Sequence, residues 1–391
     1  MYNPNISLAF KQKFIRPFYL TNKHHKGVHI LKKQKVGMAL SLVLAAGTLL
    51  GACGKSNDNK GDEAAKGGGN NQTFTAAMVT DIGGVDDKSF NQSSWEGLKS
   101  FGEENGLKKG IGGYDYLQSK SDADYTTNLN KLAREGFDLV YAIGFLMPAA
   151  VEEIATQQKD SKFAIVDAEV KQPNVASILF KEQEAGFLAG IAAAKTTKSN
   201  HIGFIGGMEI PVVERFESGF LAGVKAAKPE VKVDVQYAGA FDKAELGQTI
   251  ASKMYSSGAD VIFHSAGGTG VGLFKEANDR KAKDPGKDIW AIGVDRDQAD
   301  MGKDVVLTSA LKRVDVAVKD LATKTKEGNF PGGEVALFGL AEDGVGLAPI
   351  NAKATNKAEI EAAIKEWVEK IKSGDVKVPE SRKELKTFSP K

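Results

Sequence analysis

The feature that most constrains the fold of this chain is an alternation of short apolar runs with helix-like stretches, which occurs twice in succession. Eight runs of strand length follow residue 73: FTAAMV, IGGYDYL, DLVYAIG and FAIVDA form a first set, and HIGFIGG, VDVQYAG, DVIFHSA and WAIGVD form a second. Strands separated by amphipathic helices are typical of parallel sheets with helices on both faces. The pattern therefore predicts an α/β protein.

The two sets of runs resemble each other at nearly constant spacing. Phe90 and Phe216 are each followed, at the same distance, by a Gly-apolar-Lys triplet, and Asp167 in FAIVDAE corresponds to Asp295 in WAIGVDRD. Such a repeat indicates two similar lobes rather than one long sheet. Because open α/β sheets bind ligands beyond the carboxyl ends of their strands, the lobes should face each other across a cleft. We expect Phe90 and Phe216 at equivalent loop-to-helix positions on opposite lobes, where their rings could enclose a flat ligand.

The amino terminus differs in composition from the rest of the chain. Residues 1–52 contain eight Lys or Arg and no Asp or Glu, and the last of these lysines precedes an uncharged run from Val36 to Leu50. Such a run is too short to span a bilayer comfortably and is typical of a signal peptide. Without residues 1–52 the formal charge of +2 becomes −6, so the remaining chain gives no reason to expect nucleic-acid binding.

The end of this segment, Leu50-Gly51-Ala52-Cys53, contains the only cysteine of the chain and resembles the lipobox of bacterial lipoproteins. In a lipobox the cysteine is lipidated and becomes the new amino terminus. We therefore expect lipidation at Cys53 and a flexible tether over residues 53–72, which are rich in Gly, Asn, Lys and Asp. Because the region after residue 30 is a complete signal peptide by itself, we hypothesise that translation begins at Leu31, with Val28 as second choice.

A glycine-rich segment, Gly267–Gly272, follows the run DVIFHSA, and the next run ends at Asp295. This arrangement is close to a dinucleotide-binding fingerprint, but its third glycine is displaced, and the export signal disfavours a nicotinamide enzyme. Glycines at this point would still let a ligand approach backbone amides. A carboxylate at a strand end can also accept hydrogen bonds from both hydroxyls of a ribose.

Patterns typical of catalysis or metal binding are scarce. After the amino-terminal segment the only histidines are His201 and His264, with no nucleophile at triad-like spacing and no cluster of metal ligands. His264, at a strand end, is interpreted either as a ligand contact or as a packed side chain, and the acidic pair Asp86-Asp87 as a solvated loop. We therefore expect a protein that is not an enzyme and that has no metal and no cofactor.

Two further patterns are interpreted as structural. Trp95 and Phe220 recur at helical spacing and should lie in the core. The run NKAEIEAAIKEWVEKIKSGDVKVP is typical of an amphipathic helix. Its apolar side chains should pack inward: Ile360, Ile364, Trp367, Val368 and Ile371.

Five segments together carry a family resemblance: DIGGVDDKSFNQ, FKEQEAGFLAG, GFIGGMEIPVVERFESGFLAG, GVDRDQ and SALKRVD. From about Phe74 to Pro379 the chain resembles the basic membrane protein family of substrate-binding lipoproteins. These are relatives of bacterial purine nucleoside receptors that supply ATP-driven importers. The resemblance implies a type I periplasmic-binding-protein fold, with two Rossmann-like lobes joined by strands that cross near Phe180 and around residues 307–335. The first lobe is expected over residues 73–179 with a return segment at about 310–335, and the second over 180–309 with the part at about 336–391.

The resemblance also implies a nucleoside in the cleft. Phe90 and Phe216 would sandwich the base and Asp81 would contact its polar edge, while Asp295 with Lys312 would bind the ribose. The complete set of ligand-binding candidates is Asp81, Phe90, Asn91, Phe216, Gly268, Asp295 and Lys312, with Gly268 offering its backbone to the sugar.

The expected function is that of a lipid-anchored binding protein on the extracytoplasmic face of the cell membrane. It would capture a purine nucleoside and deliver it to an ABC permease and its ATPase. Two other functions stay open at this point. One is a receptor of the same fold for another small ligand, such as a sugar or another ribosylated compound, and the other is a surface lipoprotein for signalling or interaction.

Overall fold

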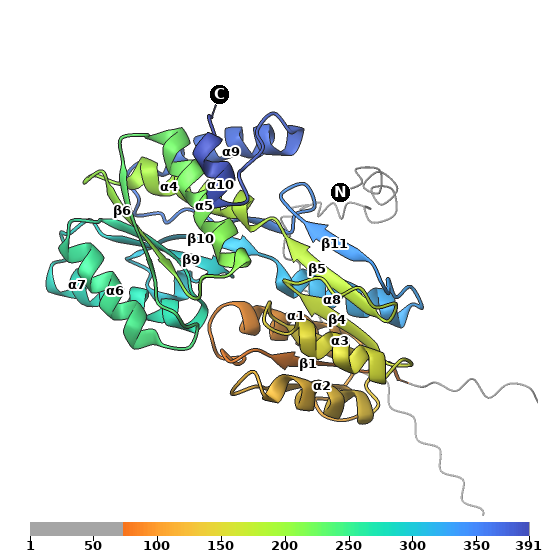
Figure 1. Cartoon of the computed structure of the whole chain (residues 1–391). Helices are drawn as coiled ribbons and strands as arrows, with labels where there is room; N and C mark the ends of the chain where they lie inside the picture. The colour runs from red at the N-terminus through yellow and green to blue at the C-terminus, as the bar shows by residue number, and fades with distance from the viewer. Residues whose placement is uncertain (1–72, 391) are drawn as a thin grey trace, which may run out of the picture. The chain divides into compact units, whose positions relative to one another are not determined.

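The computed structural model describes residues 73–390 (Figure 1). The expected signal peptide, the lipidation site Cys53 and the tether lie outside the described residues. The described part belongs to one compact unit that contains two β-sheets. Within it, no helix has both the length and the apolar character needed to cross a membrane.

The first sheet is parallel throughout, with the strand order β11-β5-β4-β3-β1-β2. Four of its strands are the first four apolar runs of the sequence, and β5 and β11 extend it on one side. The strands are β1 (Ala76–Thr80), β2 (Tyr114–Gln118), β3 (Leu139–Ile143), β4 (Lys162–Val166), β5 (Val175–Phe180) and β11 (Val335–Phe338).

Helices cover both faces of this sheet, and together they make the first lobe. Alternate residues of β1 point to opposite faces, so that Met78 packs in the same cluster as Leu98 while Val79 packs with Leu129. Two of the helices, α1 and α8, lie against each other on one face, and α2 and α3 lie on the other. The helices are α1 (Phe90–Glu104), α2 (Asp124–Arg134), α3 (Pro148–Gln157) and α8 (Val314–Lys326).

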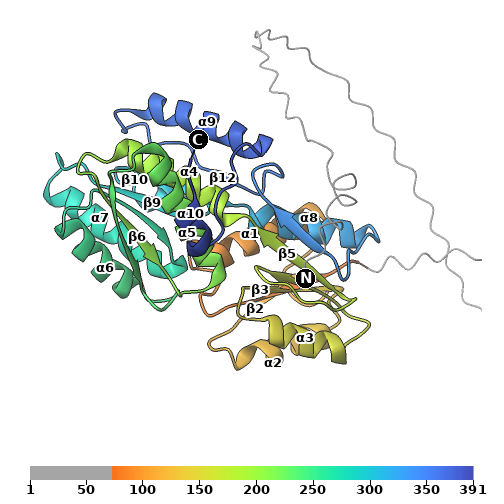
Figure 2. The same cartoon turned by 45° about the horizontal axis from the view of Figure 1, so that its top comes forward.

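The second lobe repeats this plan around a sheet of order β12-β10-β9-β8-β6-β7, in which only β12 runs antiparallel to its neighbour (Figure 2). Its strands are β6 (His201–Gly206), β7 (Lys232–Tyr237), β8 (Val261–Ser265), β9 (Trp290–Asp295), β10 (Val306–Lys312) and β12 (Val345–Leu347). Its helices are α4 (Glu182–Thr196), α5 (Pro211–Ala227), α6 (Ala244–Ser256), α7 (Val271–Lys283), α9 (Lys357–Ser373) and α10 (Arg382–Thr387). All eight predicted runs form strands, so the predicted α/β class with two lobes is confirmed.

The chain crosses between the lobes at Lys181, at Arg313 and over residues 339–344. β10 stays in the second sheet as far as Lys312, and the segment that returns to the first lobe consists of α8 and β11, residues 314–338. The return segment that we expected at about 310–335 thus begins and ends a few residues later in the structure. One consequence is that Lys312 ends a strand of the second lobe directly beside a crossing point.

The helices α4 and α5 of the second lobe contact each other through their backbones. Residues 186–190 and 219–223 have the same sequence, GFLAG. A Cβ atom on Gly190 would lie 2.2 Å from the carbonyl oxygen of Phe220, and one on Gly223 would lie 2.1 Å from that of Phe187. Only glycine permits so close an approach, which explains why two segments of the family resemblance share this motif.

The amphipathic helix expected near the carboxyl terminus is present as α9. α9 buries Ile360 and Ile371, and its other apolar side chains pack against the core as expected. Trp367 meets Phe187 of α4 edge to face, with ring centroids 5.1 Å apart. Phe220 lies in the core with no exposed surface, as predicted. Trp95 is only partly buried and packs against the edge of this core.

Candidate ligand-binding site

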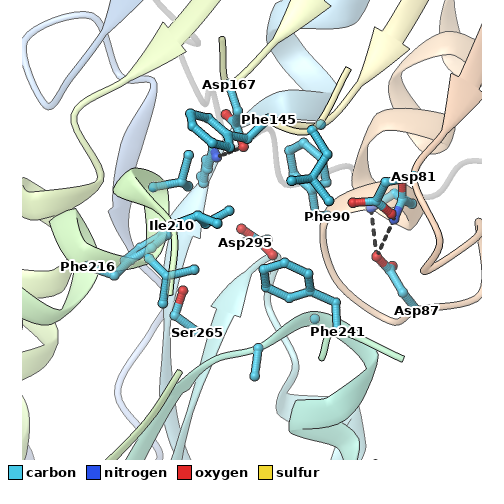
Figure 3. A pocket seen from close by; sticks show the side chains of 18 residues that line it. Asp81, Asp87, Phe90, Phe145, Asp167, Ile210, Phe216, Phe241, Ser265 and Asp295 are labelled. Atoms are coloured by element: carbon cyan, nitrogen blue, oxygen red, sulfur yellow. Dashed lines mark hydrogen bonds and ion pairs between the residues drawn. The ribbon is translucent and has the colours of Figure 1, made fainter. Parts of the chain in front are cut away.

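A cavity lies where the carboxyl ends of strands from both sheets meet (Figure 3). The space within it amounts to about 590 Å³, including space open to solvent. Asp81 follows β1 and Asp167 follows β4, whereas Ser265 and Asp295 end β8 and β9. The lining consists of Asp81, Asp87, Phe90, Asn91, Gly144, Phe145, Leu146 and Asp167 from the first lobe, and Ile210, Val212, Val213, Phe216, Phe241, Ser265, Ala266, Gly267, Asp295 and Lys312 from the second.

The loop between β1 and α1 is held by Asp87, which caps the helix. Its Oδ1 accepts hydrogen bonds from the backbone N–H groups of Ser89 and Gln92 at 2.8 and 3.1 Å, and its Oδ2 accepts from that of Asn91 at 2.9 Å. Backbone amides at a helix start have no acceptor within the helix, so the carboxylate satisfies them. Asp87 is 5% exposed, and the interpretation of this acidic pair as a solvated loop is wrong for Asp87. Because Asp87 supplies the cap, the hydroxyl of the N-cap residue Ser89 is not needed for it, and Phe90 follows as the first helical residue.

Aromatic rings from both lobes face the cavity. Phe90 and Phe145 of the first lobe and Phe241 of the second are half-buried, and their rings surround its centre (Figure 3). Phe216 also lines the cavity but is only 1% exposed, and its ring packs against Phe263 with centroids 6.1 Å apart. α5 begins more than a turn before Phe216, so the expected loop-to-helix position is wrong for this residue.

A buried charged cluster lies at one end of the cavity. Lys312 is 1% exposed, and its Nζ lies 2.6 Å from Oδ2 of Asp167 and 3.1 Å from Oε1 of Glu182. Arg215 donates from Nε to Oε2 of Glu182 at 2.5 Å. Burial opposes the charge on Lys312, but the two carboxylates outweigh it and raise the lysine pKa. Lys312 is therefore a fixed ammonium group in the wall of the site.

The two aspartates that the repeat paired occupy equivalent conformations beside this cluster. Asp167 and Asp295 each follow the core of a strand with a left-handed backbone, at φ values of 74° and 65°. Asp295 accepts a hydrogen bond from the hydroxyl of Ser89 on the other lobe. Burial raises the pKa of Asp295 to about 7, although Lys312 and the Ser89 bond oppose the shift. The ion pairs of Lys312 are thus made with Asp167 and Glu182, while Asp295 meets Ser89.

Asp81 is at the other end of the cavity. Its Oδ1 accepts from Nδ2 of Asn91 at 2.7 Å and from the backbone N–H of Gly83 at 2.9 Å. Burial raises the pKa of Asp81 to about 6, and these two hydrogen bonds oppose the shift. Figure 3 shows Asp81 next to Asp87 at the edge of the cavity, on the same side as Phe90.

Further contacts join the lobes beside the site. Gln298, which is fully buried, donates from Nε2 to the carbonyl oxygen of Lys88 at 2.9 Å. Arg296 and Glu96 form an ion pair at 3.4 Å across the same boundary. With the bond between Ser89 and Asp295, these contacts hold the cleft in a closed arrangement.

All the candidate ligand residues except Gly268 line this cavity. Gly268 lies between the lobes instead, where a Cβ atom on it would be 3.2 Å from the carbonyl oxygen of Phe241 and 3.8 Å from Asp87. Its neighbour Gly267 lines the cavity. Sequence reasoning did not name Phe145, Phe241 or Ser265, and no motif marks them. It could have named Asp167, because the repeat had already matched this residue with Asp295.

His264 is not a ligand contact. It has no exposed surface, its Nε2 lies 3.1 Å from Oε1 of Gln298, and burial lowers its pKa to about 4. Among the described residues, no group of three or more His, Cys, Asp or Glu is placed to hold a metal ion. The cavity as a whole offers aromatic rings on which a flat group could stack, and carboxylate acceptors at each of its two ends.

The family model of the ABC transporter substrate-binding proteins called Bmp, PnrA-like, matches residues 74–382. The chain belongs to the Bmp family. It is accordingly a substrate-binding protein of an ABC transporter and not an enzyme, and its partners are the permease and ATPase of such a transporter.

Relatives of this Bmp protein are similar over nearly their whole length. A protein of Listeria innocua named CD4+ T-cell-stimulating antigen is 51% identical, over 90% of this chain and 99% of the relative. The ABC transporter nucleoside-binding protein BmpA of Lactococcus lactis is 44% identical, over 89% and 99%. Basic membrane protein A of Borreliella burgdorferi is 33% identical, over 78% and 88%.

A solved structure supports the same assignment. The ABC transporter solute-binding protein of Aeropyrum pernix K1 superimposes with a TM-score of 0.70 at 29% identity, covering 80% of this chain and 96% of that one. The predicted type I periplasmic-binding-protein fold is therefore confirmed for this Bmp protein.

Proposed function

We propose that this Bmp protein captures a purine nucleoside between its lobes and delivers it to its ABC permease, while a lipid on Cys53 holds it at the extracytoplasmic face of the membrane. The observation that carries the proposal is the pairing of half-buried aromatic rings from opposite lobes with carboxylates at both ends of one cavity. The name of the Lactococcus lactis relative, a nucleoside-binding protein, supports it.

The base would stack between Phe90 of the first lobe and Phe241 of the second. We favour Phe241 over Phe216 as the second wall, because Phe216 is packed against Phe263 and has almost no free surface. The ribose would lie toward Asp295 and Lys312, within reach of the hydroxyl of Ser265 at the end of β8.

The magnitudes of these interactions suit a transport protein. Aromatic faces contribute about 1 to 3 kcal/mol for each stacked base. Hydrogen bonds to charged groups such as Asp295 add about 1.5 to 3 kcal/mol each. After the cost of association, micromolar binding, about −8 kcal/mol, is within reach.

Mass spectrometry of the small molecule released from the denatured purified protein tests this proposal. We expect the mass of a purine ribonucleoside, in an amount comparable to the protein. A free sugar released in that amount would contradict the nucleoside and favour the other small-ligand receptor of this fold.

A further inference from the structure

The edge of the cavity at Asp81 has an unusual composition of hydrogen-bonding groups, which follows from the orientation of Asn91. The amide Nδ2 of Asn91 donates to Oδ1 of Asp81 at 2.7 Å and to Oδ2 of Asp87 at 3.0 Å. Both amide hydrogens are therefore taken by carboxylates, and the side chain cannot turn over without placing its oxygen against them. Asn91 is left with an acceptor and no donor.

That acceptor is not used within the protein. Oδ1 of Asn91 is buried and has no hydrogen-bond partner among the described residues, although Asn91 lines the cavity. Buried acceptors without a partner are rare and call for an explanation, and a ligand that donates to this oxygen would supply one.

Asp81 adds a second acceptor beside it. Its Oδ1 takes the bonds from Asn91 and Gly83, whereas no residue in the range 73–390 donates to its Oδ2. Asp87 has no such free oxygen, because its two oxygens already accept four bonds from the start of α1. Asp81 and Asn91 thus present adjacent acceptors to the cavity, and neither presents a donor.

Donors are available next to these acceptors on the loop that follows β3. A Cβ atom on Gly144 would lie 3.3 Å from Oδ2 of Asp81, so this loop passes close to the carboxylate. Phe145 and Leu146 line the cavity, and in the described part of the chain their backbone N–H groups have no acceptor. The edge therefore offers two acceptors, with backbone donors beside them on the loop that follows β3.

We propose that Asp81 and Asn91 form an acceptor edge that selects 6-oxopurine nucleosides, guanosine above all, over adenosine. This inference rests on the proposed function. Guanine carries adjacent donors at N1 and at its 2-amino group, next to the acceptor O6, which complements the edge. Inosine keeps the N1 donor and O6 but lacks the amino group. In the pose that places N1 and the 2-amino group of guanine on these two acceptors, adenine would turn the lone pair of its N1 toward an acceptor of the protein. In any other pose adenine offers both acceptors only the single nitrogen of its 6-amino group.

Calorimetric titration of the purified protein, freed of bound ligand, with guanosine, inosine and adenosine at pH 8 tests the inference. We expect guanosine to bind at least about tenfold more tightly than adenosine, with inosine between them, because a mismatched polar edge leaves buried groups unpaired. Asp81→Asn adds donors to the edge and should reduce the ratio of the two affinities. Ser265→Ala, at the sugar end, is the matched control and should weaken both nucleosides without changing the ratio.

Circular dichroism melts of both variants show whether they are folded, and the comparison of nucleosides on the unchanged protein does not depend on any variant. Adenosine bound as tightly as guanosine would overturn the acceptor edge and leave the nucleoside proposal standing. Binding of no nucleoside would overturn both.

Discussion

At the scale of single residues, the site depends on carboxylates that are held in a buried setting. Asp295 and Asp81 both have pKa values raised by burial, to about 7 and about 6. The groups that face Asp295 come from several elements: Lys312 ends β10, Ser89 precedes α1, and the carboxylates of Asp87 and Asp167 come from the first lobe. Binding of hydroxyl donors favours the ionised carboxylate and should lower the pKa of Asp295.

This gives a pH dependence with a definite sign. Nucleoside affinity should be level above pH 7 and should fall as the pH falls, by up to about tenfold for each unit below the Asp295 pKa. Below pH 6 the fall should become steeper, because Asp81 also takes up a proton. Titrations between pH 5 and pH 8.5 measure this, and Asp295→Asn should lose the part of the slope above pH 6. An affinity that stays constant over this range would contradict the role of the ionised carboxylate.

The same shift affects the stability of the unliganded protein in the opposite direction. Because the pKa of Asp295 rises from 3.8 to about 7 on folding, the folded protein holds a proton that the unfolded chain releases between these values. The stability contribution of Asp295 is therefore complete below pH 3.8 and is lost as the pH rises through 7. Ligand binding is favoured where this contribution has been lost.

At the scale of elements, the sequence predicted strands well and helix starts less well. The alternation of apolar runs located eight strands, because buried parallel strands are nearly continuous apolar segments. The repeat also matched Gly97 with Gly223, and both glycines press against the backbone of a neighbouring helix. It did not reveal that α5 has an additional turn before Phe216, because Pro211 begins a helix without changing the spacing of the apolar residues.

The different burial of Phe216 and Phe241 allows the two residues to be distinguished experimentally. Phe241→Ala should weaken nucleoside binding by roughly ten- to a hundredfold, as expected for loss of a stacking face, with little change in the melting temperature of the unliganded protein. Phe216→Ala should instead lower stability by about 3 to 5 kcal/mol, as is usual for a buried phenylalanine. Calorimetry and thermal melts on both variants measure the two effects.

The reverse pattern would restore the sandwich predicted from sequence. In that case Phe216→Ala would lose affinity at nearly constant stability, and Phe241→Ala would bind as the unchanged protein does. The sequence could not separate these residues, because Phe241 lies in the loop between β7 and α6, where no periodic pattern exists.

At the scale of the whole molecule, the lobes are connected both by chain crossings and by side chains at the cleft. The crossings at Lys181 and Arg313 lie next to Glu182 and Lys312, which pair at 3.1 Å. Asp167 of the first lobe and Arg215 of the second complete this cluster. The sequence predicted two lobes and a cleft but not this cluster, since its members are far apart in the chain and only the fold brings them together.

The most direct test of the central claim, that the closed cleft binds a purine ribonucleoside, is a titration that removes one part of the ligand at a time. Guanosine, 2′-deoxyguanosine and guanine are titrated into the protein after its bound ligand has been removed, and into Asp295→Ala. We predict micromolar or tighter binding of guanosine. Loss of the 2′-hydroxyl should cost about 1 to 3 kcal/mol because Asp295 loses a partner, guanine should bind more weakly still, and the variant should bind the ribose and deoxyribose forms alike. Equal affinity for guanosine and guanine would contradict the role of Asp295, and no measurable binding of any nucleoside would contradict the central claim.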